Sequence, residues 1–247
     1  MTCSDLPDWY LQRRIAVVDL GSAAWRKARA EVVPPGYAAD ECLRRLTKAG
    51  RVRRIARGRY AVVDPVRETP PIALASALFA DEQHYVTTDA ALAFHGAIDQ
   101  PIRQIAVVLP HSRRPIDVGP AVVRPVTMGA DQFTTADAYD TTIEGFKIRV
   151  ATREQAVVDA LAEPAWMVNG DLLAEVLANF TVDEIDRTAS AARARSTAAA
   201  QRLGYLLEDA GRPIVDSLTS LRPVRAIKLR PGHRTGGPYS TRWRVYG

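Results

Sequence analysis

Eight cationic side chains lie within sixteen residues of the first quarter of the chain, with no acidic residue among them. They are Arg44, Arg45, Lys48, Arg51, Arg53, Arg54, Arg57 and Arg59. Guanidinium and ammonium groups at this density attract a polyanion, because each can neutralise a phosphate. A surface that serves solubility alone usually mixes both signs of charge. We therefore expect this segment to contact double-stranded DNA.

The elements that must position these cations can be read from the apolar periodicity. Ala39, Leu43 and Leu46 recur at helical spacing, and Gly50 follows at the position where helices commonly end. After Gly50 the period changes to two, and Gly58 supplies the positive φ of a hairpin turn. Helices are expected over residues 8–18, 22–31 and 38–49, and strands over residues 51–56 and 59–63. Three helices followed by a hairpin predict a winged helix-turn-helix domain.

This fold predicts different roles for the cations. A helix can enter the major groove, so Arg44, Arg45 and Lys48 are the candidates for reading base edges. The strands carry the residues that would hold phosphates or enter the minor groove, namely Arg53, Arg54, Arg57 and Arg59. Arg51 fits either role. Tyr37, just before the third helix, fits a phosphate contact and a half-buried packing role equally well.

The sequence shows no pattern of a catalytic or metal site. None of the histidines, which are His84, His95, His111 and His233, lies three or four residues from another His or from a Cys. His95 precedes Gly96 at an expected helix end, where a donor favours the helix dipole. There is no Gly-rich phosphate loop and no nucleophile beside a base. We expect no enzyme activity, no metal and no cofactor.

Beyond a Pro-containing linker at residues 65–71, the pattern alternates between helices and strands. Further helices are expected over residues 72–80, 88–95, 152–161, 181–194 and 198–210, and the Ala-rich stretch 189–200 is also read as helix. Strands are expected over residues 102–109 and 122–126, and a further strand or hairpin over residues 141–150. Thr152 with Gln155 and Thr181 with Glu184 each suggest a capping box. We predict an α+β protein, with the winged helix-turn-helix domain at residues 1–68 and a larger mixed α/β domain at residues 69–247.

Charge is unevenly distributed along the chain. Residues 1–68 carry a net charge of +6, residues 69–216 carry −8, and residues 217–247 carry +7 without any acidic residue. The cations of this basic tail are Arg222, Arg225, Lys228, Arg230, Arg234, Arg242 and Arg244. The tail could reach DNA, bind an acidic partner or neutralise the acidic middle of the chain.

The two cysteines are Cys3, in an expected tail, and Cys42, in an expected helix. Such sparse usage favours reduced thiols in a cytoplasm over a disulfide. No apolar run is long enough to span a bilayer, and the first residues lack the pattern of a secretory signal. We expect a cytoplasmic protein.

Four stretches in order make the chain resemble the AbiEi-type antitoxins of bacterial type IV (abortive infection) toxin–antitoxin systems. The first runs from Leu43 to Tyr60 (LRRLTKAGRVRRIARGRY) and the second from Tyr85 to Gly96 (YVTTDAALAFHG). The third runs from Ile148 to Leu161 (IRVATREQAVVDAL), and the fourth from Ala199 to Glu208 (AAQRLGYLLE) before the basic tail. The first helix matches the family less obviously.

The resemblance implies a repressor and an antitoxin in one chain. The winged helix would bind inverted repeats in its own promoter, and the C-terminal domain would counteract a nucleotidyltransferase-like toxin without forming a stable complex with it. It also implies that the C-terminal domain can share in DNA binding. Two other hypotheses are a stand-alone winged-helix regulator with a ligand- or partner-sensing domain, and an enzyme with unrecognised catalytic residues within 72–216.

Overall fold

The computed structural model describes residues 3–34, 38–231 and 238–247. The chain folds into two compact units that each draw on several segments. The first comprises residues 1–86, 103–127 and 139–150, and the second comprises residues 87–102, 128–138 and 151–247. The fold is of the mixed α+β class, as the sequence predicts. The predicted boundary at residue 68 stays a prediction.

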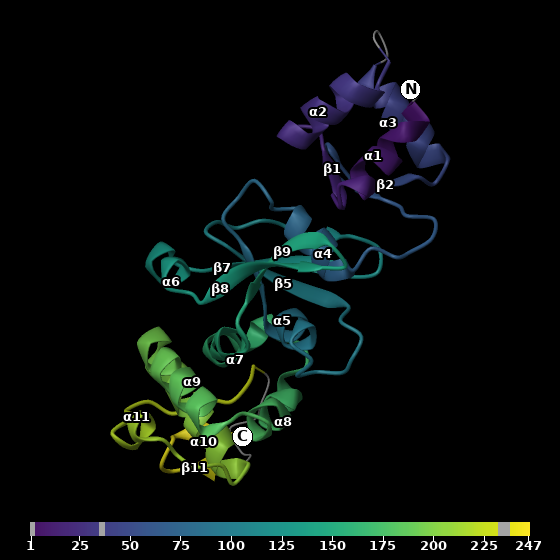
Figure 1. Cartoon of the computed structure of the whole chain (residues 1–247). Coiled ribbons are helices and arrows are strands. Elements are labelled where there is room, and N and C mark those ends of the chain that lie inside the picture. Colours follow the sequence, from purple (N-terminus) through teal and green to yellow (C-terminus); the bar gives the residue numbers. More distant parts are fainter. Residues whose placement is uncertain (1–2, 35–37, 232–237) are drawn as a thin grey trace. The chain divides into compact units, whose positions relative to one another are not determined.

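The N-terminal part of the first unit alternates short helices with three strands (Figure 1). In chain order the elements are the 3-10 helix η1 (Cys3–Asp5), α1 (Leu6–Gln12), β1 (Val17–Asp19), α2 (Ala23–Val32), α3 (Ala39–Lys48), β2 (Val52–Ala56) and β3 (Arg59–Val62). The strands form an antiparallel sheet in the order β1-β3-β2. Gly58, with φ of 72°, makes the predicted turn between β2 and β3.

The expectation of one helix over residues 8–18 is wrong. Helix α1 ends at Gln12, Arg14 takes a positive φ of 53°, and Val17 pairs with Ala61 as part of β1. The run Ile15-Ala16-Val17-Val18 is rich in β-branched residues, which favour a strand once a partner strand exists. Cys3 was expected in a tail and instead lies in η1, where it packs against the apolar core.

The apolar core of this part is formed by all three α-helices and the sheet. Trp9, Trp25, Leu43 and Leu46 are buried in it together. Ser22 caps α2 as predicted, because its hydroxyl accepts a hydrogen bond from the Trp25 amide at 3.1 Å. Burial of the Leu43 side of α3 leaves the opposite side of that helix exposed.

A six-stranded sheet follows along the chain, in the order β6-β7-β5-β4-β9-β8. Its strands are β4 (Tyr85–Thr87), β5 (Gln104–Leu109), β6 (Ile116–Asp117), β7 (Val122–Thr127), β8 (Ala138–Ile143) and β9 (Phe146–Ala151). β5 pairs with β7 and β4 with β9 in parallel, while β6 runs antiparallel to β7. Helix α4 (Pro71–Ala77) packs against β5. The sequence predicts β5 and β7, and its strand or hairpin over residues 141–150 overlaps β8 and β9, whereas β4 and β6 are not predicted.

The second unit is mainly helical, with helices α9 and α10 side by side in Figure 1. Its helices are α5 (Thr88–Phe94), α6 (Ala130–Thr134), α7 (Arg153–Ala162), η2 (Pro164–Trp166), η3 (Gly170–Leu172), α8 (Leu173–Ala178), α9 (Val182–Arg195), α10 (Thr197–Asp209) and α11 (Asp216–Thr219). α7 packs against α5, α9 and α10. Three two-residue strands, β10 (Ile227–Lys228), β11 (Tyr239–Ser240) and β12 (Val245–Tyr246), form a sheet in the order β10-β12-β11.

Two features of the predicted helices needed correction. The Ala-rich stretch is not one helix, because Ser196 leaves the helical conformation at φ −172° and caps α10 through the Ala199 amide. Thr152 caps α7, but the Gln155 side chain does not complete a capping box, because it is engaged by the Asp137 amide and by Asp159. The box of Thr181 and Glu184 is complete, as predicted.

A network of buried polar groups connects the segments of the second unit. The Asp159 carboxylate is fully buried and accepts hydrogen bonds from the Thr87 hydroxyl at 2.7 Å and from the Gln155 amide at 2.8 Å. The buried Asp89 carboxylate accepts from the backbone amides of Val168 and Asn169 at 2.9 and 3.0 Å. Buried carboxylates are stable only when donors surround them. The chain is thereby held in one arrangement around α5 and α7.

Replacement of Asp159 by Ala should destabilise the protein strongly. The Thr87 and Gln155 donors would stay buried without their acceptor, which we expect to cost about 3 kcal/mol of unfolding free energy. Urea denaturation followed by circular dichroism measures the loss. Glu154→Ala is the control on the same helix, because its ion pair with the exposed Arg187 should contribute less than about 1 kcal/mol. Equal losses in the two variants would contradict the importance of the buried network.

In the first unit, Ser76 on α4 and His84 just before β4 form a buried pair. The Ser76 oxygen lies 2.8 Å from His84 Nε2 and accepts a hydrogen bond from the Arg149 amide of β9. Burial lowers the pKa of His84, against a smaller opposing effect of its contact with the Glu82 carbonyl. The folded protein therefore holds this imidazole neutral.

Acid should weaken the first unit through His84. Because the pKa of His84 is lower in the folded state, the unfolded chain takes up a proton first as the pH falls through the ordinary pKa of about 6.5. His84 therefore makes its full contribution to the free energy of unfolding above that pH, and this contribution is lost as the pH falls below it. Thermal unfolding measured between pH 7.5 and 5 should show a smaller decline for His84→Asn than for the unaltered chain. An identical decline would exclude His84 as its source.

Candidate nucleic-acid interface

Helix α3 presents two of the predicted base-reading arginines on its exposed side. The guanidinium groups of Arg44 and Arg45 are 71% and 60% exposed. Both bind Glu41 of the preceding turn: Arg44 through two hydrogen bonds of 2.9 Å, and Arg45 through Nε at 2.7 Å. The i, i+3 and i, i+4 spacing places all three on one face of the helix. Lys48, one turn further on, is also exposed.

Glu41 also belongs to this surface, although it is acidic and lies before the predicted basic segment. Hydrogen bonds from Arg45 and then from Arg44 lower the pKa of its carboxyl, so Glu41 is ionised at neutral pH. It lies just before the acid-free run that begins at Arg44, and its helical spacing to Arg44 and Arg45 was the available signal. One carboxylate thus orients two guanidinium groups at the start of the exposed face.

Two more of the predicted cations are held by acidic residues of the same unit. Arg51 binds Asp8 of α1 at 2.5 Å, and Arg59 of β3 binds Asp19 of β1 at 2.7 Å. The Arg59 and Asp19 side chains are each only 25% exposed. The first pair joins the segment just after α3 to α1, and the second joins two neighbouring strands of the small sheet. Arg51 and Arg59 are therefore less available to an external anion than the sequence suggested.

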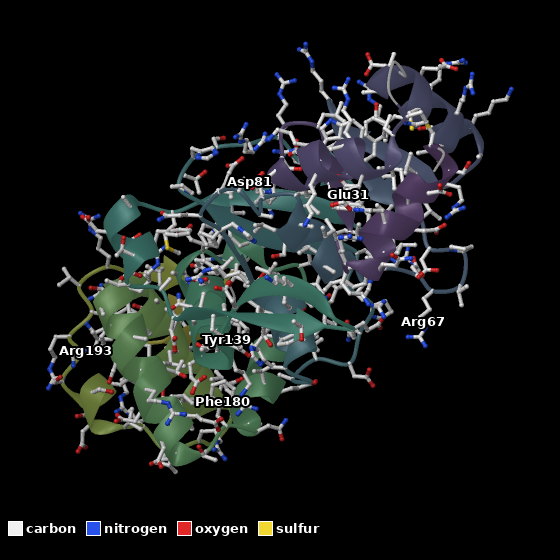
Figure 2. All side chains as sticks on the ribbon, turned by 45° about the horizontal axis from the view of Figure 1, so that its top comes forward. Glu31, Arg67, Asp81, Tyr139, Phe180 and Arg193 are labelled. Atoms are coloured by element: carbon white, nitrogen blue, oxygen red, sulfur yellow. The ribbon has the colours of Figure 1, made fainter. Side chains whose placement is uncertain are left out.

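The remaining cations of the hairpin extend from β2 and its turn. Arg54 and Arg57 are exposed and, like Lys48, form no ion pair within residues 3–34, 38–231 and 238–247. Arg53 donates a hydrogen bond to the carbonyl of Val118. Nitrogen-tipped side chains project from the purple N-terminal ribbon in Figure 2. Tyr37, the ninth predicted residue, lies outside the described residues.

The basic tail divides into paired and unpaired cations. Arg230 binds Asp171, and Arg242 binds Glu208 at 3.0 Å, so two tail arginines neutralise acids of the middle of the chain. Exposed side chains without an ion pair in the described part of the tail are Arg222, Arg225, Lys228 and Arg244. Arg222 donates to the carbonyls of Thr219 and Leu221. Arg234 lies outside the described residues.

The backbone of the tail is anchored to α10. The Gln201 amide donates to the carbonyls of Arg225 and Trp243 at 2.9 and 2.8 Å, and Arg202 donates to that of Lys228. The indole of Trp243 is buried against Gly204, where a β-carbon would lie 2.4 Å from the ring. The described part of the tail, residues 217–231 and 238–247, is therefore held against the second unit, with its unpaired cations exposed.

The described histidines have local structural contacts. His95 ends α5, and its Nε2 lies 2.8 Å from the carbonyl of Ala151, while His111 lies 2.9 Å from Glu82. Among the residues the structure describes, no group of three or more His, Cys, Asp or Glu side chains could hold a metal ion. No helix in the same residues is long and apolar enough to cross a membrane. His233 lies outside the described residues.

Comparison with solved structures supports the fold of the chain. The crystal structure of the RV2827C protein from Mycobacterium tuberculosis matches with a TM-score of 0.68, over 98% of this chain and 90% of that chain. The two sequences are 18% identical, so this similarity concerns the fold alone. A search of curated protein sequences found no match.

A family model describes the middle of the chain. The model of the AbiEi antitoxin C-terminal domain matches residues 85–209, which is half of the sequence. The match contains the strand–helix segment that begins at β4 and the helices α7, α9 and α10. It therefore also contains the buried network of Thr87, Asp89, Gln155 and Asp159. This match supports an antitoxin role in a toxin–antitoxin system. The family is not an enzyme family. The chain belongs to the AbiEi antitoxin family.

Proposed function

We propose that this protein is a DNA-binding antitoxin that represses its own operon. Residues 1–68 would bind inverted repeats in the promoter, and residues 69–247 would counteract a nucleotidyltransferase-like toxin. The observation that carries the proposal is the match of residues 85–209 to the AbiEi antitoxin C-terminal domain, in a chain that begins with a separate basic segment. Family membership supports the antitoxin role, and the electrostatics of α3 and β2 support the DNA-binding role.

The order of elements supports a winged helix-turn-helix in residues 1–68. A strand between the first two helices pairs with a C-terminal hairpin, in the order α1-β1-α2-α3-β2-β3. In such a domain the third helix enters the major groove and the hairpin forms the wing. Burial of Leu43 and Leu46 turns the cationic side of α3 outward, as a recognition helix requires.

The contacts of the individual side chains suggest how they share this task. Lys48, Arg54 and Arg57 have no competing ion pair in the part of the chain described, so they suit phosphate binding directly. Arg44 and Arg45 would read bases while Glu41 sets their orientation, since an arginine fork can donate two bonds to guanine. Arg51, Arg53 and Arg59 would mainly fix the wing in place.

The tail is proposed as a second DNA-contacting surface. Arg222, Arg225, Lys228 and Arg244 are exposed on a segment that Gln201 and Trp243 hold against α10. The pairing of Arg230 and Arg242 with acids of the same unit supports internal neutralisation for those two residues only. We further propose a functional link to the toxin without a stable complex, and a cytoplasmic location.

The second candidate function is a stand-alone winged-helix regulator whose larger domain senses a ligand or partner. The same basic elements of α3 and β2 would support it equally. The two candidates differ in their dependence on a toxin, because only an antitoxin restores the growth of cells that express one. The identity of the neighbouring gene would also separate them.

Removing cations from the proposed interface should weaken DNA binding in two distinguishable ways. Arg54→Ala and Arg57→Ala should each reduce affinity for all DNA sequences. Each should also reduce the steepness of the plot of log affinity against log salt concentration by about one, the equivalent of one released counterion. Arg44→Ala should lower discrimination between the promoter and unrelated DNA, at a cost of roughly 1–3 kcal/mol. Mobility-shift titrations of the upstream promoter at several salt concentrations measure both effects.

Arg67→Ala is the matched control for these titrations, because Arg67 is exposed but lies outside the proposed interface (Figure 2). Its affinity and salt dependence should equal those of the unaltered chain. Arg225→Ala in the same titration tests the tail. Unchanged binding in Arg44→Ala, Arg54→Ala and Arg57→Ala together would refute the assignment of α3 and β2.

Co-expression with the toxin should rescue growth independently of DNA binding. A variant with Arg44, Arg54 and Arg57 all changed to Ala should lose repression of a promoter–reporter fusion and keep the rescue, because those residues lie outside the matched 85–209 segment. Colony counts after toxin induction measure the rescue. Failure of the unaltered chain to rescue growth, with repression intact, would favour the stand-alone regulator.

A further inference from the structure

The only two cysteines of the chain meet beside the proposed recognition helix. Cys3 lies in η1 and Cys42 in α3, and these two elements pack together. Cys3 packs against the core cluster that contains Cys42, although 38 residues separate the two in the sequence. Both are free thiols in this structure, Cys42 fully buried and Cys3 partly exposed.

Both cysteines contact the apolar core of the N-terminal part of the first unit. Cys42 lies in the apolar cluster that also contains Leu43 and Leu46, and Cys3 packs against the same cluster. Arg44 and Arg45 follow Cys42 on the exposed side of α3. A covalent change at Cys42 therefore acts on the helix that carries the proposed base-reading side chains.

We propose that Cys3 and Cys42 form a redox-sensitive thiol pair whose oxidation to a disulfide alters DNA binding by α3. The oxidant class is a peroxide. Formation of the disulfide removes two electrons and two protons from the thiols and reduces one hydrogen peroxide to two waters. The DNA-binding part of this inference rests on the proposed function.

The two cysteines have different roles in the reaction. Cys3 is the exposed partner, so its sulfur attacks the peroxide oxygen, the O–O bond breaks, and a sulfenic acid and one water result. Cys42 then attacks the Cys3 sulfur, and the departing hydroxide takes the Cys42 proton as the second water. Burial, followed by the interaction with Cys3, raises the pKa of the Cys42 thiol to about 12, which keeps Cys42 protonated and protects it from reacting with peroxide before Cys3 does.

The disulfide should change the position of α3. A sulfur–sulfur bond is about 2.05 Å long, much shorter than the separation of two sulfurs that are not bonded to each other. Closing this gap draws α3 and η1 together, and the exposed face of α3 moves with its backbone. Base recognition is sensitive to such displacement, so we expect oxidation to weaken promoter binding by about fivefold or more, comparable with the loss of one base contact.

The first test measures the bond without DNA. The full-length protein is treated with hydrogen peroxide, alkylated and digested with trypsin, and its peptides are examined by mass spectrometry before and after reduction. We expect two tryptic peptides, residues 1–13 and residues 30–44, joined by a disulfide, and this product should come from the monomeric protein. Cys3→Ser should leave Cys42 reduced, and Cys42→Ala should accumulate Cys3 sulfenic acid, detected with dimedone. Absence of the linked product, or links only between two chains, would overturn the proposal.

The second test measures the consequence for DNA. Oxidised unaltered protein should bind the promoter more weakly in a mobility-shift titration, dithiothreitol should restore the affinity, and Cys3→Ser should not respond to peroxide. A disulfide that forms without any change in affinity would overturn the regulatory role. If no form of the protein binds the promoter, the proposed DNA-binding function fails, whereas the peptide result on the thiol pair stands on its own.

Discussion

The second unit depends on the need of one buried carboxylate for hydrogen-bond donors. Asp159 has no exposed surface, so its charge requires buried donors, among which are Thr87 and Gln155. Thr87 ends β4 and Gln155 lies in the first turn of α7, so the carboxylate joins segments that are far apart in the sequence. Asp89 acts similarly in the first turn of α5, by holding the amides of Val168 and Asn169. Changes at these positions should therefore disturb the arrangement of the helices.

Carboxylates also organise the N-terminal basic surface, but there they are only partly buried. Glu41 orients Arg44 and Arg45, Asp19 holds Arg59, and Asp8 holds Arg51. Ion pairs that solvent can reach contribute little to stability, because solvent screens them and ordering the side chains costs entropy. Their effect is to restrict where each guanidinium group points. The surface is thus better ordered, and less strongly positive, than a count of its arginines indicates.

Much of the local structure could be predicted because caps and periodicity are encoded within a few residues. Ser22, Gly58 and the Thr181–Glu184 box all act locally, and each occurs where the sequence indicated. β1 was missed because Val17 and Val18 become a strand only by pairing with β3, which lies more than forty residues away. The Asp159 network was missed for the same reason. Of the candidate site, the cations could be identified from sequence, whereas their partners Glu41, Asp8 and Asp19 depend on helix spacing and tertiary contacts.

The pairing of the cations also limits how tightly one copy of the proposed domain can hold DNA. Lys48, Arg54 and Arg57 are the strongest candidates for phosphate contacts free of internal competition, which corresponds to a salt slope of only about −3. Well-studied repressors with many phosphate contacts have slopes of around −10. A domain held only by these three phosphate contacts would dissociate readily from the promoter at physiological salt. Tight repression by this surface therefore requires additional contacts, either from Arg225 and its neighbours in the tail or from a second copy on the other half of an inverted repeat.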